Sequence, residues 1–348
     1  MRSSHDAIGR RVAPPGPAAA GGPPVDQAGR TARIALMELD FVADLLARIP
    51  ADPRLEVPPG DDAAVLRPPA ERRTVVTVDM LMEGVDFILG PDCSPWQVGQ
   101  KSLAVNLSDL AAMAARPEAA VAAVSLPRRH GDTVGRGLLD GILAVAAEFG
   151  VMLAGGDTNA WDGPLVIAIT ALGSVPPGRA WRRSGARVGD LLVVSGSFGG
   201  SLLGRHLAVT PRCREALVIA ERFEVHAAID ISDGLSLDTA RLMQASGTAA
   251  VLDLASIPIH ADARRMATRP EDRASPLEHA LADGEDFELL LALPPDEARR
   301  LVAEAPTLLG VPFTAIGEVV AGTGLMARAA DGTTRPLTPQ GYVHAFDG

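Results

Sequence analysis

The chain has 348 residues, 47% of them hydrophobic, and a formal net charge of −11. This length favours two hydrophobic cores, and the acidic balance argues against nucleic acid or anionic membranes as partners, although bound cations would admit a polyanionic ligand. Lys101 is the only lysine, so no G-K-[ST] sequence exists and a Walker A loop is excluded.

The apolar runs of the sequence are too short to predict membrane insertion or export. No apolar run approaches the roughly 20 residues of a membrane helix, and the N-terminus has no apolar signal core. Cys93 and Cys213 form no C-x-x-C pair, and the seven histidines include no H-x-x-x-H pair. We therefore expect a cytoplasmic protein with reduced thiols and no zinc site.

The first half alternates helical and extended patterns. Residues 1–34 are rich in Ala, Gly, Pro and Arg, which predicts a disordered tail, and a helical pattern begins at Met37. The segment 94–115 predicts a helix with Ser94 as N-cap and Pro95 in its first turn. The segment 133–149 predicts a second helix that Gly150 terminates. Strands are expected at 75–78, 151–154 and 165–175, and the Pro-Pro-Gly sequence at 176–178 is the expected domain boundary.

The second half predicts further strands and helices. The glycine-rich loop at 196–200 is expected to lead into a helix, and amphipathic helices are expected at 237–245 and 294–305. Strands are expected at 191–195, up to Ile231, 250–254, 287–293, 313–319 and 325–329. The fold class is therefore α/β or α+β, without an obvious internal repeat.

Five short motifs place acidic groups beside the ends of apolar segments. Each alone is explained by turn formation or helix capping. Together their oxygen donors suit Mg²⁺ held jointly with substrate phosphates. The motifs lie at 60–62, 77–79, 106–109, 155–158 and 230–234.

The segment 94–115 is apolar nearly all round, which indicates a buried helix. Ser102, Asn106 and Asp109 lie at i, i+4 and i+7 and form one polar stripe. Because an unpaired buried carboxylate is costly, Asp109 requires a partner. That partner is Mg²⁺ shared with other carboxylates, or in part Lys101, or backbone groups.

Several glycines and arginines could contact phosphates, but each group also has an ordinary structural explanation. Gly155 and Gly156 let the backbone approach a phosphate closely, and the loop 196–200 is either a helix-terminal anion site or an ordinary turn. The arginines that follow the boundary form either a solvated linker or a phosphate clamp. They are Arg179, Arg182, Arg183 and Arg187.

Seven motifs, read in order, resemble the thiamine-monophosphate kinase family over roughly residues 37–346. They are 60–66, 101–113, 155–158, 183–186, 230–235, 284–290 and 341–344. The resemblance implies the two-domain fold shared with aminoimidazole ribonucleotide synthetase, with ATP bound between the domains. It also implies an N-terminal ATP- and Mg²⁺-binding domain at 35–175 that pairs in a homodimer, and a C-terminal α/β domain at 176–348.

The resemblance also assigns site residues. The positions that match Mg²⁺ ligands are Asp62, Thr77, Val78, Asp79, Asp109, Asp157, Asp230 and Asp233. The nucleotide positions are Gly156, Asp157, Arg183 and Ser232, together with Phe149, which stands near a family Tyr. Glu285 and Tyr342 match contacts to the thiamine moiety. Asp86 stands where the family often has a His near the substrate, so it belongs either to the acceptor pocket or to a turn before Phe87.

The implied reaction is ATP-dependent phosphorylation of thiamine monophosphate to thiamine diphosphate by direct in-line transfer with several Mg²⁺ ions. A phosphate monoester is mostly dianionic at neutral pH, so no general base is required. Charge cancellation by cations is the main need. The alternatives are a sibling ATP-dependent synthetase of the same fold, or a non-catalytic nucleotide-binding paralogue.

Overall fold

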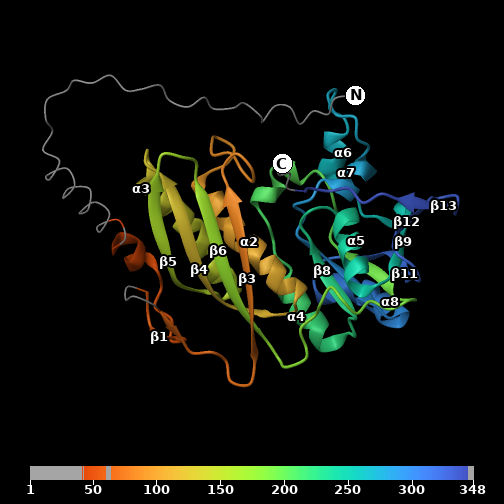
Figure 1. Ribbon diagram of the computed structural model, residues 1–348, viewed down its shortest axis with the longest axis horizontal. Helices are drawn as coiled ribbons and strands as arrows, with labels where there is room; N and C mark the ends of the chain where they lie inside the picture. The colour runs from red at the N-terminus through yellow and green to blue at the C-terminus, as the bar shows by residue number, and fades with distance from the viewer. Residues whose placement is uncertain (1–40, 42, 60–63, 344–348) are drawn as a thin grey trace, which may run out of the picture.

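The computed structural model describes residues 41, 43–59 and 64–343 (Figure 1). The tail expected at 1–34, the helix start at Met37, the ligand expected at Asp62 and the motif residue His344 lie outside these residues. The predicted mixed α/β fold class is confirmed by two separate sheets, each with its own helices.

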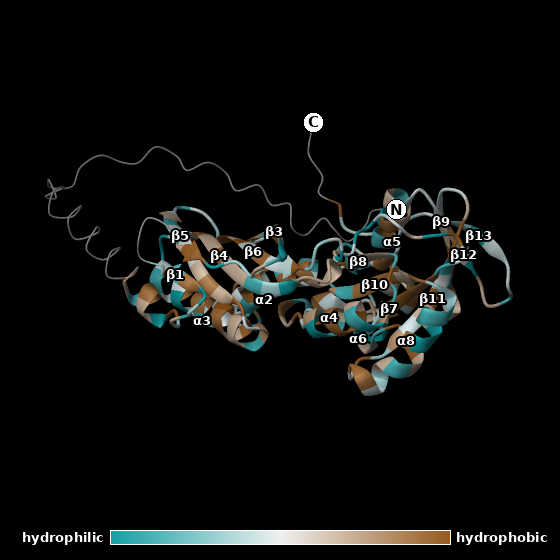
Figure 2. Cartoon of the chain, turned by 90° about the horizontal axis from the view of Figure 1, so that it is seen from below, coloured by the Kyte–Doolittle hydropathy of each residue, from teal (hydrophilic) through white to brown (hydrophobic). Residues whose placement is uncertain are grey.

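The N-terminal half is built on a four-stranded sheet. Its order is β3-β6-β4-β5, in which β4 and β5 are parallel and the other pairs antiparallel. The strands are β3 (Arg73–Met82), β4 (Arg116–Pro127), β5 (Met152–Trp161) and β6 (Val166–Val175), and β1 (Leu55–Val57) pairs with β2 (Val65–Leu66) beside them. In Figure 2 hydrophobic residues run along β4 and β6.

Two helices, α2 (Pro95–Ala112) and α3 (Gly131–Phe149), cover one face of this sheet. They approach closely because glycines face the partner backbone. A Cβ on Gly99 would lie 2.1 Å from the carbonyl oxygen of Leu138, and a Cβ on Gly141 would lie 2.0 Å from that of Trp96. Any larger residue at these two positions would therefore force α2 and α3 apart.

The C-terminal half is built on a seven-stranded sheet of order β13-β12-β9-β11-β7-β10-β8, in which β9 and β12 are parallel and the other neighbouring pairs are antiparallel. The strands are β7 (Leu191–Ser195), β8 (Ala227–Ile231), β9 (Ala249–Asp253), β10 (Glu288–Leu293), β11 (Phe313–Val320), β12 (Gly324–Arg328) and β13 (Thr334–Leu337). The helices are α4 (Cys213–Arg222), α5 (Leu235–Ser246), α6 (Ala261–Met266), α7 (Pro276–Ala282) and α8 (Pro295–Leu308).

Helix α2 joins the two halves. It contacts β3, β4 and β6 on one side and α4 and β8 on the other. One hydrophobic core runs from Leu103 and Leu110 of α2 into Cys213 and Ile219 of α4. In Figure 1 the C-terminal end of α2 accordingly lies beside α4. The two halves thus share one apolar core, and this packing fixes the position of α2 and of its polar side chains relative to the second sheet.

Most sequence-based boundaries are close to the observed ones. Ser94 caps α2 in a capping box with Gln97, as expected for its start, and Gly150 ends α3 in a left-handed conformation. The predicted extension of α2 to residue 115 is wrong, because the helix ends at Ala112 and Ala114 has a φ of +52°. The last turn is thus replaced by a sharp reversal.

Two further predictions were wrong or incomplete. Strand β4 was not predicted, since its alanine-rich sequence has low intrinsic strand preference and becomes a strand through pairing on both sides. The loop 196–200 does not lead into an α-helix. It enters two 3₁₀ helices, Ser201–Leu203 and Arg205–Leu207, separated by Gly204 with a φ of +121°.

We predict that Gly141→Ala destabilises the protein, because the added methyl group meets the Trp96 carbonyl. The expected loss in free energy of unfolding is about 1–3 kcal/mol, the usual cost of overpacking. Gly90→Ala is the control, since nothing lies within 4 Å of its built Cβ. Chemical denaturation of both variants measures the difference, and equal stabilities would contradict the close crossing of α2 and α3.

Candidate functional site

Four carboxylates gather where β3, α2 and the loop after β8 meet. We call Asp79, Asp109, Asp230 and Asp233 the carboxylate cluster. The hydroxyl of Thr77 donates to Asp109, and Ser108 Oγ donates to Asp230 Oδ2 over 2.6 Å. These contacts link the first sheet to α2, and α2 to the second sheet.

The electrostatics of the cluster show mutual repulsion. Burial, followed by the charges of Asp109, Asp233 and Asp86, raises the pKa of Asp79 to about 7. Burial, followed by the charge of Asp109, raises the pKa of Asp230 to about 7 against the bond from Ser108. Burial also raises the pKa of Asp109, although Thr77 and the charge of Arg183 oppose the shift. A bound cation would relieve this repulsion.

Asn106 completes the polar stripe that the sequence predicted on α2. Its Oδ1 accepts from the backbone N–H of Asp79 over 3.1 Å, and its amide donates to the Ser102 carbonyl over 2.9 Å. Ser102 itself donates to the Gly99 carbonyl and so stays within the helix. Asn106 therefore positions the strand that carries Asp79, whereas Ser102 does not reach the cluster.

The loop 232–234 is held by a carboxylate that sequence reasoning missed. Asp238 Oδ2 accepts the backbone N–H groups of Ser232, Asp233 and Gly234 at 3.1, 2.9 and 3.2 Å. Arg241 pairs with both Asp233 and Asp238. The available signal was an acidic residue in the first turn of a predicted helix, where it caps backbone donors.

The two residues expected to contact the thiamine moiety, Glu285 and Tyr342, lie at this loop. The N–H of Glu285 donates to the Ser232 carbonyl over 2.6 Å, and the N–H of Tyr342 donates to the Asp233 carbonyl over 2.9 Å. Segments some fifty and one hundred residues downstream of β8 therefore converge on its end, as the order of the motifs implied.

Lys101 does not pair with Asp109, so that part of the sequence-based expectation is wrong. Its fully buried ammonium donates to both Glu285 carboxylate oxygens over 2.8 Å and to the Asp86 carbonyl over 2.9 Å. The reason is direction: Lys101 lies two helical turns before Asp109, near the start of α2. Lys101 thus bridges α2 to the segment that carries Glu285.

Asp86 lies close to the cluster, since its charge affects the pKa of Asp79. Its carboxylate also accepts the backbone N–H of Met82 over 2.7 Å. Asp86 therefore stabilises a turn, as one of the two sequence-based alternatives expected, and it also lies near the carboxylate cluster.

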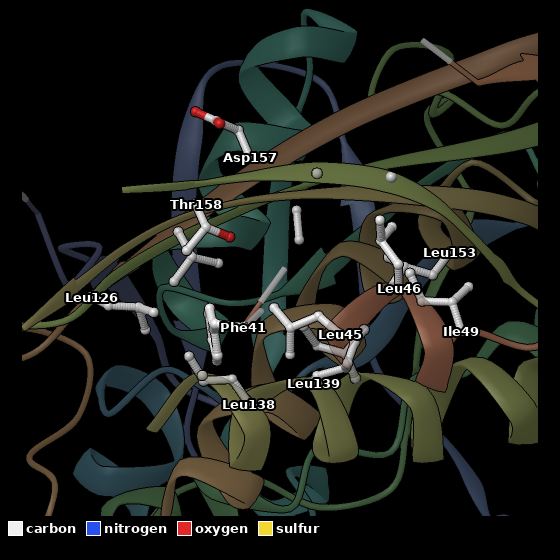
Figure 3. A pocket seen from close by; sticks show the side chains of 16 residues that line it. Phe41, Leu45, Leu46, Ile49, Leu126, Leu138, Leu139, Leu153, Asp157 and Thr158 are labelled. Carbon is white, nitrogen blue, oxygen red and sulfur yellow. The ribbon is translucent and has the colours of Figure 1, made fainter. Parts of the chain in front are cut away.

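The structure does not bring Asp157 to the carboxylate cluster. Asp79 and Gly156 occupy one row across the sheet, through Ile169 and Ala122. They lie on opposite edge strands, three strand spacings or roughly 14 Å apart. Thr77 and Asp79 face α2, whereas the side chain of Asp157 points away from the helices (Figure 3). One chain therefore does not place these carboxylates around a common ion.

Gly156 borders an apolar cavity of about 670 Å³, including the space at its mouth. The cavity lies between β4, β5, α3 and the segment of Phe41, Leu45, Leu46 and Ile49, and Leu138, Leu139 and Thr158 point into it (Figure 3). Phe149 is not among its lining residues, and the Arg214 guanidinium lies 5.3 Å from the centre of the Phe149 ring. Thus Gly156 borders this cavity, whereas Phe149 packs against Arg214 outside it.

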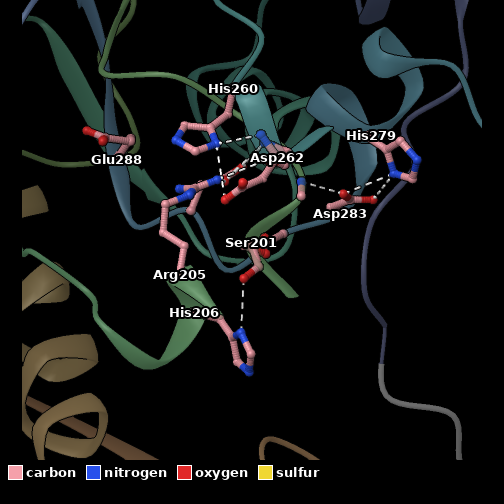
Figure 4. Close-up of polar contacts among 12 residues, drawn as sticks. Ser201, Arg205, His206, His260, Asp262, His279, Asp283 and Glu288 are labelled. Atoms are coloured by element: carbon pink, nitrogen blue, oxygen red, sulfur yellow. Dashed lines mark hydrogen bonds and ion pairs between the residues drawn. The ribbon is translucent and has the colours of Figure 1, made fainter. Parts of the chain in front are cut away.

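A second, polar pocket of about 330 Å³ lies beside Glu285. Arg205 pairs with Asp286 over 2.7 Å, and Arg212 pairs with Glu288. Burial raises the pKa of Asp286 to about 7 against the effect of Arg205. Figure 4 shows Arg205, Ser201 and Glu288 in this region. Sequence reasoning missed these ion pairs, because their partners lie far apart in the chain.

Across the residues that the structure describes, no group of three His, Cys, Asp or Glu side chains is arranged to hold a metal ion. Within the same residues, no helix has both the length and the hydrophobicity needed to cross a membrane. The carboxylate cluster is accordingly an acidic region and not a closed metal cage.

Comparison with known proteins identifies the class. Residues 60–175 match the N-terminal domain of AIR synthase related proteins, and residues 187–329 match the C-terminal domain. The hydrogenase maturation protein HypE of E. coli shares the fold, with a TM-score of 0.71 and 17% identity over 89% of this chain and 98% of that chain. The chain is therefore a member of the AIR synthase related class.

Closer relatives define the family within that class. Thiamine-monophosphate kinase of Rhodopirellula baltica is 42% identical over 88% of this chain and 97% of its own length. The E. coli K12 enzyme is 35% identical over 82% and 90%. The crystal structure of the Stenotrophomonas maltophilia enzyme has a TM-score of 0.71 and 35% identity over 86% of this chain and 96% of that chain. The chain belongs to the thiamine-monophosphate kinase family, and it is an enzyme.

We predict that Asp79→Asn raises the Tm of the metal-free protein at pH 8. The pKa of Asp79 is raised to about 7 in the fold and is about 4 when unfolded. Its charge therefore costs stability progressively between pH 4 and pH 7, and the full cost, roughly 4 kcal/mol, is present above pH 7. The gain should vanish at pH 4, where the carboxyl is protonated.

Thermal unfolding at both pH values measures this effect. The control is Asp162→Asn, because the Asp162 side chain is 88% exposed and its ion pair with Arg128 lies at the surface, where such pairs contribute little. A Tm for Asp79→Asn that equals or falls below the wild-type value at pH 8 would contradict the repulsion.

Proposed function

We propose that this enzyme transfers the γ-phosphoryl group of ATP directly to the phosphate of thiamine monophosphate, giving thiamine diphosphate. The observation that carries the proposal is the carboxylate cluster at the junction of the two halves, with Glu285 and Tyr342 anchored to the same loop. The acceptor is inferred from membership in the thiamine-monophosphate kinase family. The structure of AaThiL complexed with AMPPCP and TMP has the same fold, with 24% identity and a TM-score of 0.68 over 94% of this chain and 100% of that chain.

The donor set suits Mg²⁺ that arrives with phosphates. Mg²⁺ usually takes one or two protein carboxylates and completes its shell with water and phosphate, so an open cluster fits it better than a cage would. Bound Mg²⁺ would cancel charge on the transferring phosphoryl group. The proposed ligands are Thr77, Val78, Asp79, Asp109, Asp230 and Asp233, with Asp62 outside the described residues.

The protein residues have mainly a positioning role. The acceptor phosphate is largely dianionic at neutral pH and needs no general base. Ser108 and Asn106 fix Asp230 and the strand that carries Asp79. Asp238 fixes the loop of Ser232 and Asp233. Rigid placement of this kind lowers the barrier to an in-line transfer by aligning the reactants.

We assign the nucleotide to the region of Gly156, Asp157, Arg183 and Ser232. The charge of Arg183 already acts on Asp109, which supports a role near the transferred group. Gly156 borders the apolar cavity on the helix side of the sheet, whereas the Asp157 side chain points to the opposite side (Figure 3). We do not extend the assignment to Phe149, since its ring packs against Arg214 and lies outside that cavity.

We assign the acceptor to Glu285 and Tyr342, with Asp86 at the edge of its pocket. Glu285 lines the polar pocket, and a carboxylate suits the cationic ring of thiamine monophosphate. Lys101 connects Asp86 to Glu285, since it donates to the Asp86 carbonyl as well as to the Glu285 carboxylate. A direct contact between Asp86 and the acceptor phosphate would be repulsive, so Asp86 would act on the cationic part.

A homodimer would complete the site. The sheet face opposite α2 and α3 exposes Val76, Val78 and Met80 at 61, 62 and 58%, and Asp157 lies on that side. An apolar face of this kind is typical of an interface between subunits. Pairing through it would let Asp157 of one chain approach the cluster of the other, which one chain cannot do alone.

The two alternatives are weaker. A sibling synthetase of the same fold is disfavoured by relatives that are named as kinases at up to 42% identity. A non-catalytic paralogue rests on Asp86 alone. We retain the division into a tail at 1–34 and domains at 35–175 and 176–348. We also propose a cytoplasmic location, which two buried free cysteines support.

Incubation with ATP, Mg²⁺ and thiamine monophosphate should yield thiamine diphosphate by mass spectrometry. Asp109→Asn should lower kcat at least about 100-fold, because it removes a group that acts in charge stabilisation, while the fold is kept. Asp162→Asn, on an exposed side chain, should keep wild-type kcat. Near-normal turnover of Asp109→Asn at limiting Mg²⁺ would remove Asp109 from the site.

Subunit complementation tests the shared site. Asp109→Asn and Asp157→Asn should each be inactive alone. Co-expressed together, they should form mixed dimers in which one site holds both native carboxylates, so about a quarter of wild-type activity should return. If both carboxylates act within one chain, mixing restores nothing, and the dimeric site is refuted.

A further inference from the structure

Lys101 is a buried cation that joins the two halves of the molecule. Its side chain has no exposure, although it belongs to a residue type that is almost never fully buried unless paired. An ammonium has three N–H donors, and three oxygens accept them: both carboxylate oxygens of Glu285 and the carbonyl of Asp86. The bonding capacity of Lys101 is therefore used in full.

The partner, Glu285, sits on a strained backbone. Gly284, Glu285 and Phe287 have φ angles of +72°, +54° and +52°, which is uncommon for residues other than glycine. Backbone bonds to Ser232 and Ile231 hold this segment on the loop after β8. Strain of this kind persists only where the surroundings impose it, and it points to a functional placement.

The Glu285 carboxylate is the one acidic group of the polar pocket that is held from the other half. Asp286 and Glu288, its neighbours there, are paired with Arg205 and Arg212 of the C-terminal half. Glu285 is instead held by α2, and its side chain keeps 24% exposure. Its direction toward the pocket therefore depends on Lys101.

We propose that Lys101 is a positioning residue for the acceptor: it fixes Glu285 so that the Glu285 carboxylate binds the cationic ring of thiamine monophosphate in the polar pocket. The inference rests on the proposed function and deepens it. Lys101 uses one lone pair on each Glu285 oxygen, and a carboxylate has about four such sites in all. Each oxygen can thus still contact the ligand.

The opposite role, in which Lys101 competes with the acceptor for Glu285, fits the geometry less well. Lys101 is fully enclosed and would be left as a buried charge if Glu285 turned to the ligand. The neighbouring His206 is not a substitute cation. Its Nδ1 donates to the Ser201 carbonyl over 3.0 Å, as Figure 4 shows, and burial lowers its pKa, with a further contribution from the Lys101 charge.

A double-mutant cycle tests the proposal. Lys101→Met and Glu285→Gln should each raise the KM for thiamine monophosphate at least tenfold, with the KM for ATP within twofold of wild type. The variant with both substitutions should match Glu285→Gln alone, because Lys101 acts only through the Glu285 carboxylate. Lys101→Arg, which keeps the charge, should recover part of the affinity.

Cys213→Ala is the matched control, because it removes another contact between the halves, the bond from the Cys213 thiol to the Leu107 carbonyl. It should leave both KM values unchanged. A tighter acceptor KM in Lys101→Met would establish competition, and multiplicative effects in the double variant would show independent roles; either overturns the proposal. If Lys101→Met alone fails to fold, the comparison of the double variant with Glu285→Gln still decides.

Calorimetric binding of thiamine monophosphate without ATP repeats the cycle independently of turnover. Absence of wild-type turnover with normal acceptor binding would contradict the proposed reaction and leave the role of Lys101 to be judged from binding. Acceptor binding that is the same in wild type and Lys101→Met would overturn the role of Lys101 alone.

Discussion

The burial of α2 between two sheets is the constraint on which the site depends. A helix enclosed on nearly every side leaves its polar side chains without water, so each one needs a hydrogen-bond partner within the protein, and three of them have partners on other segments. Lys101 donates to Glu285, Asn106 accepts from the backbone N–H of Asp79, and Ser108 donates to Asp230. One apolar helix therefore brings three distant parts of the chain together.

The loop after β8 is the second organising element. Its carbonyl groups accept from Glu285, Phe287 and Tyr342, while its N–H groups donate to Asp238. The backbone of this loop is thus held by three segments: the start of α5 through Asp238, the Glu285–Phe287 segment, and Tyr342. Such a loop keeps its carboxylates in place without a rigid element of its own, and the strain at Glu285 is sustained by the same bonds.

The sequence predicted what local chemistry determines. The Ser94 cap, the Gly150 terminus and the apolar strands of the second sheet follow from short patterns. It did not predict β4, whose alanines are extended only because strands pair on both sides. The polar stripe on α2 was visible from periodicity, yet the partner of Lys101 was not, because Glu285 lies 184 residues away.

The tertiary structure also decides which of the expected site residues lie close together in one chain. Asp79, Asp109, Asp230 and Asp233 meet because their elements pack in one chain. Asp157 has an equally clear motif, but the pairing register puts it on the far edge strand and on the other face. A motif states what a residue can do, whereas the register decides which residues can act together.

The shared core has a consequence for the integrity of the chain. The segment between the halves is fastened to the end of α2, since the N–H of Trp181 donates to the Met113 carbonyl, and the packing continues from α2 into α4. Separating the halves would expose that apolar packing to water and would strip Lys101 and Asp230 of their partners. The two halves are therefore not interchangeable modules, because each would expose part of this shared apolar core without the other. A chimera would have to take α2 and the residues that pack on both of its sides from the same protein.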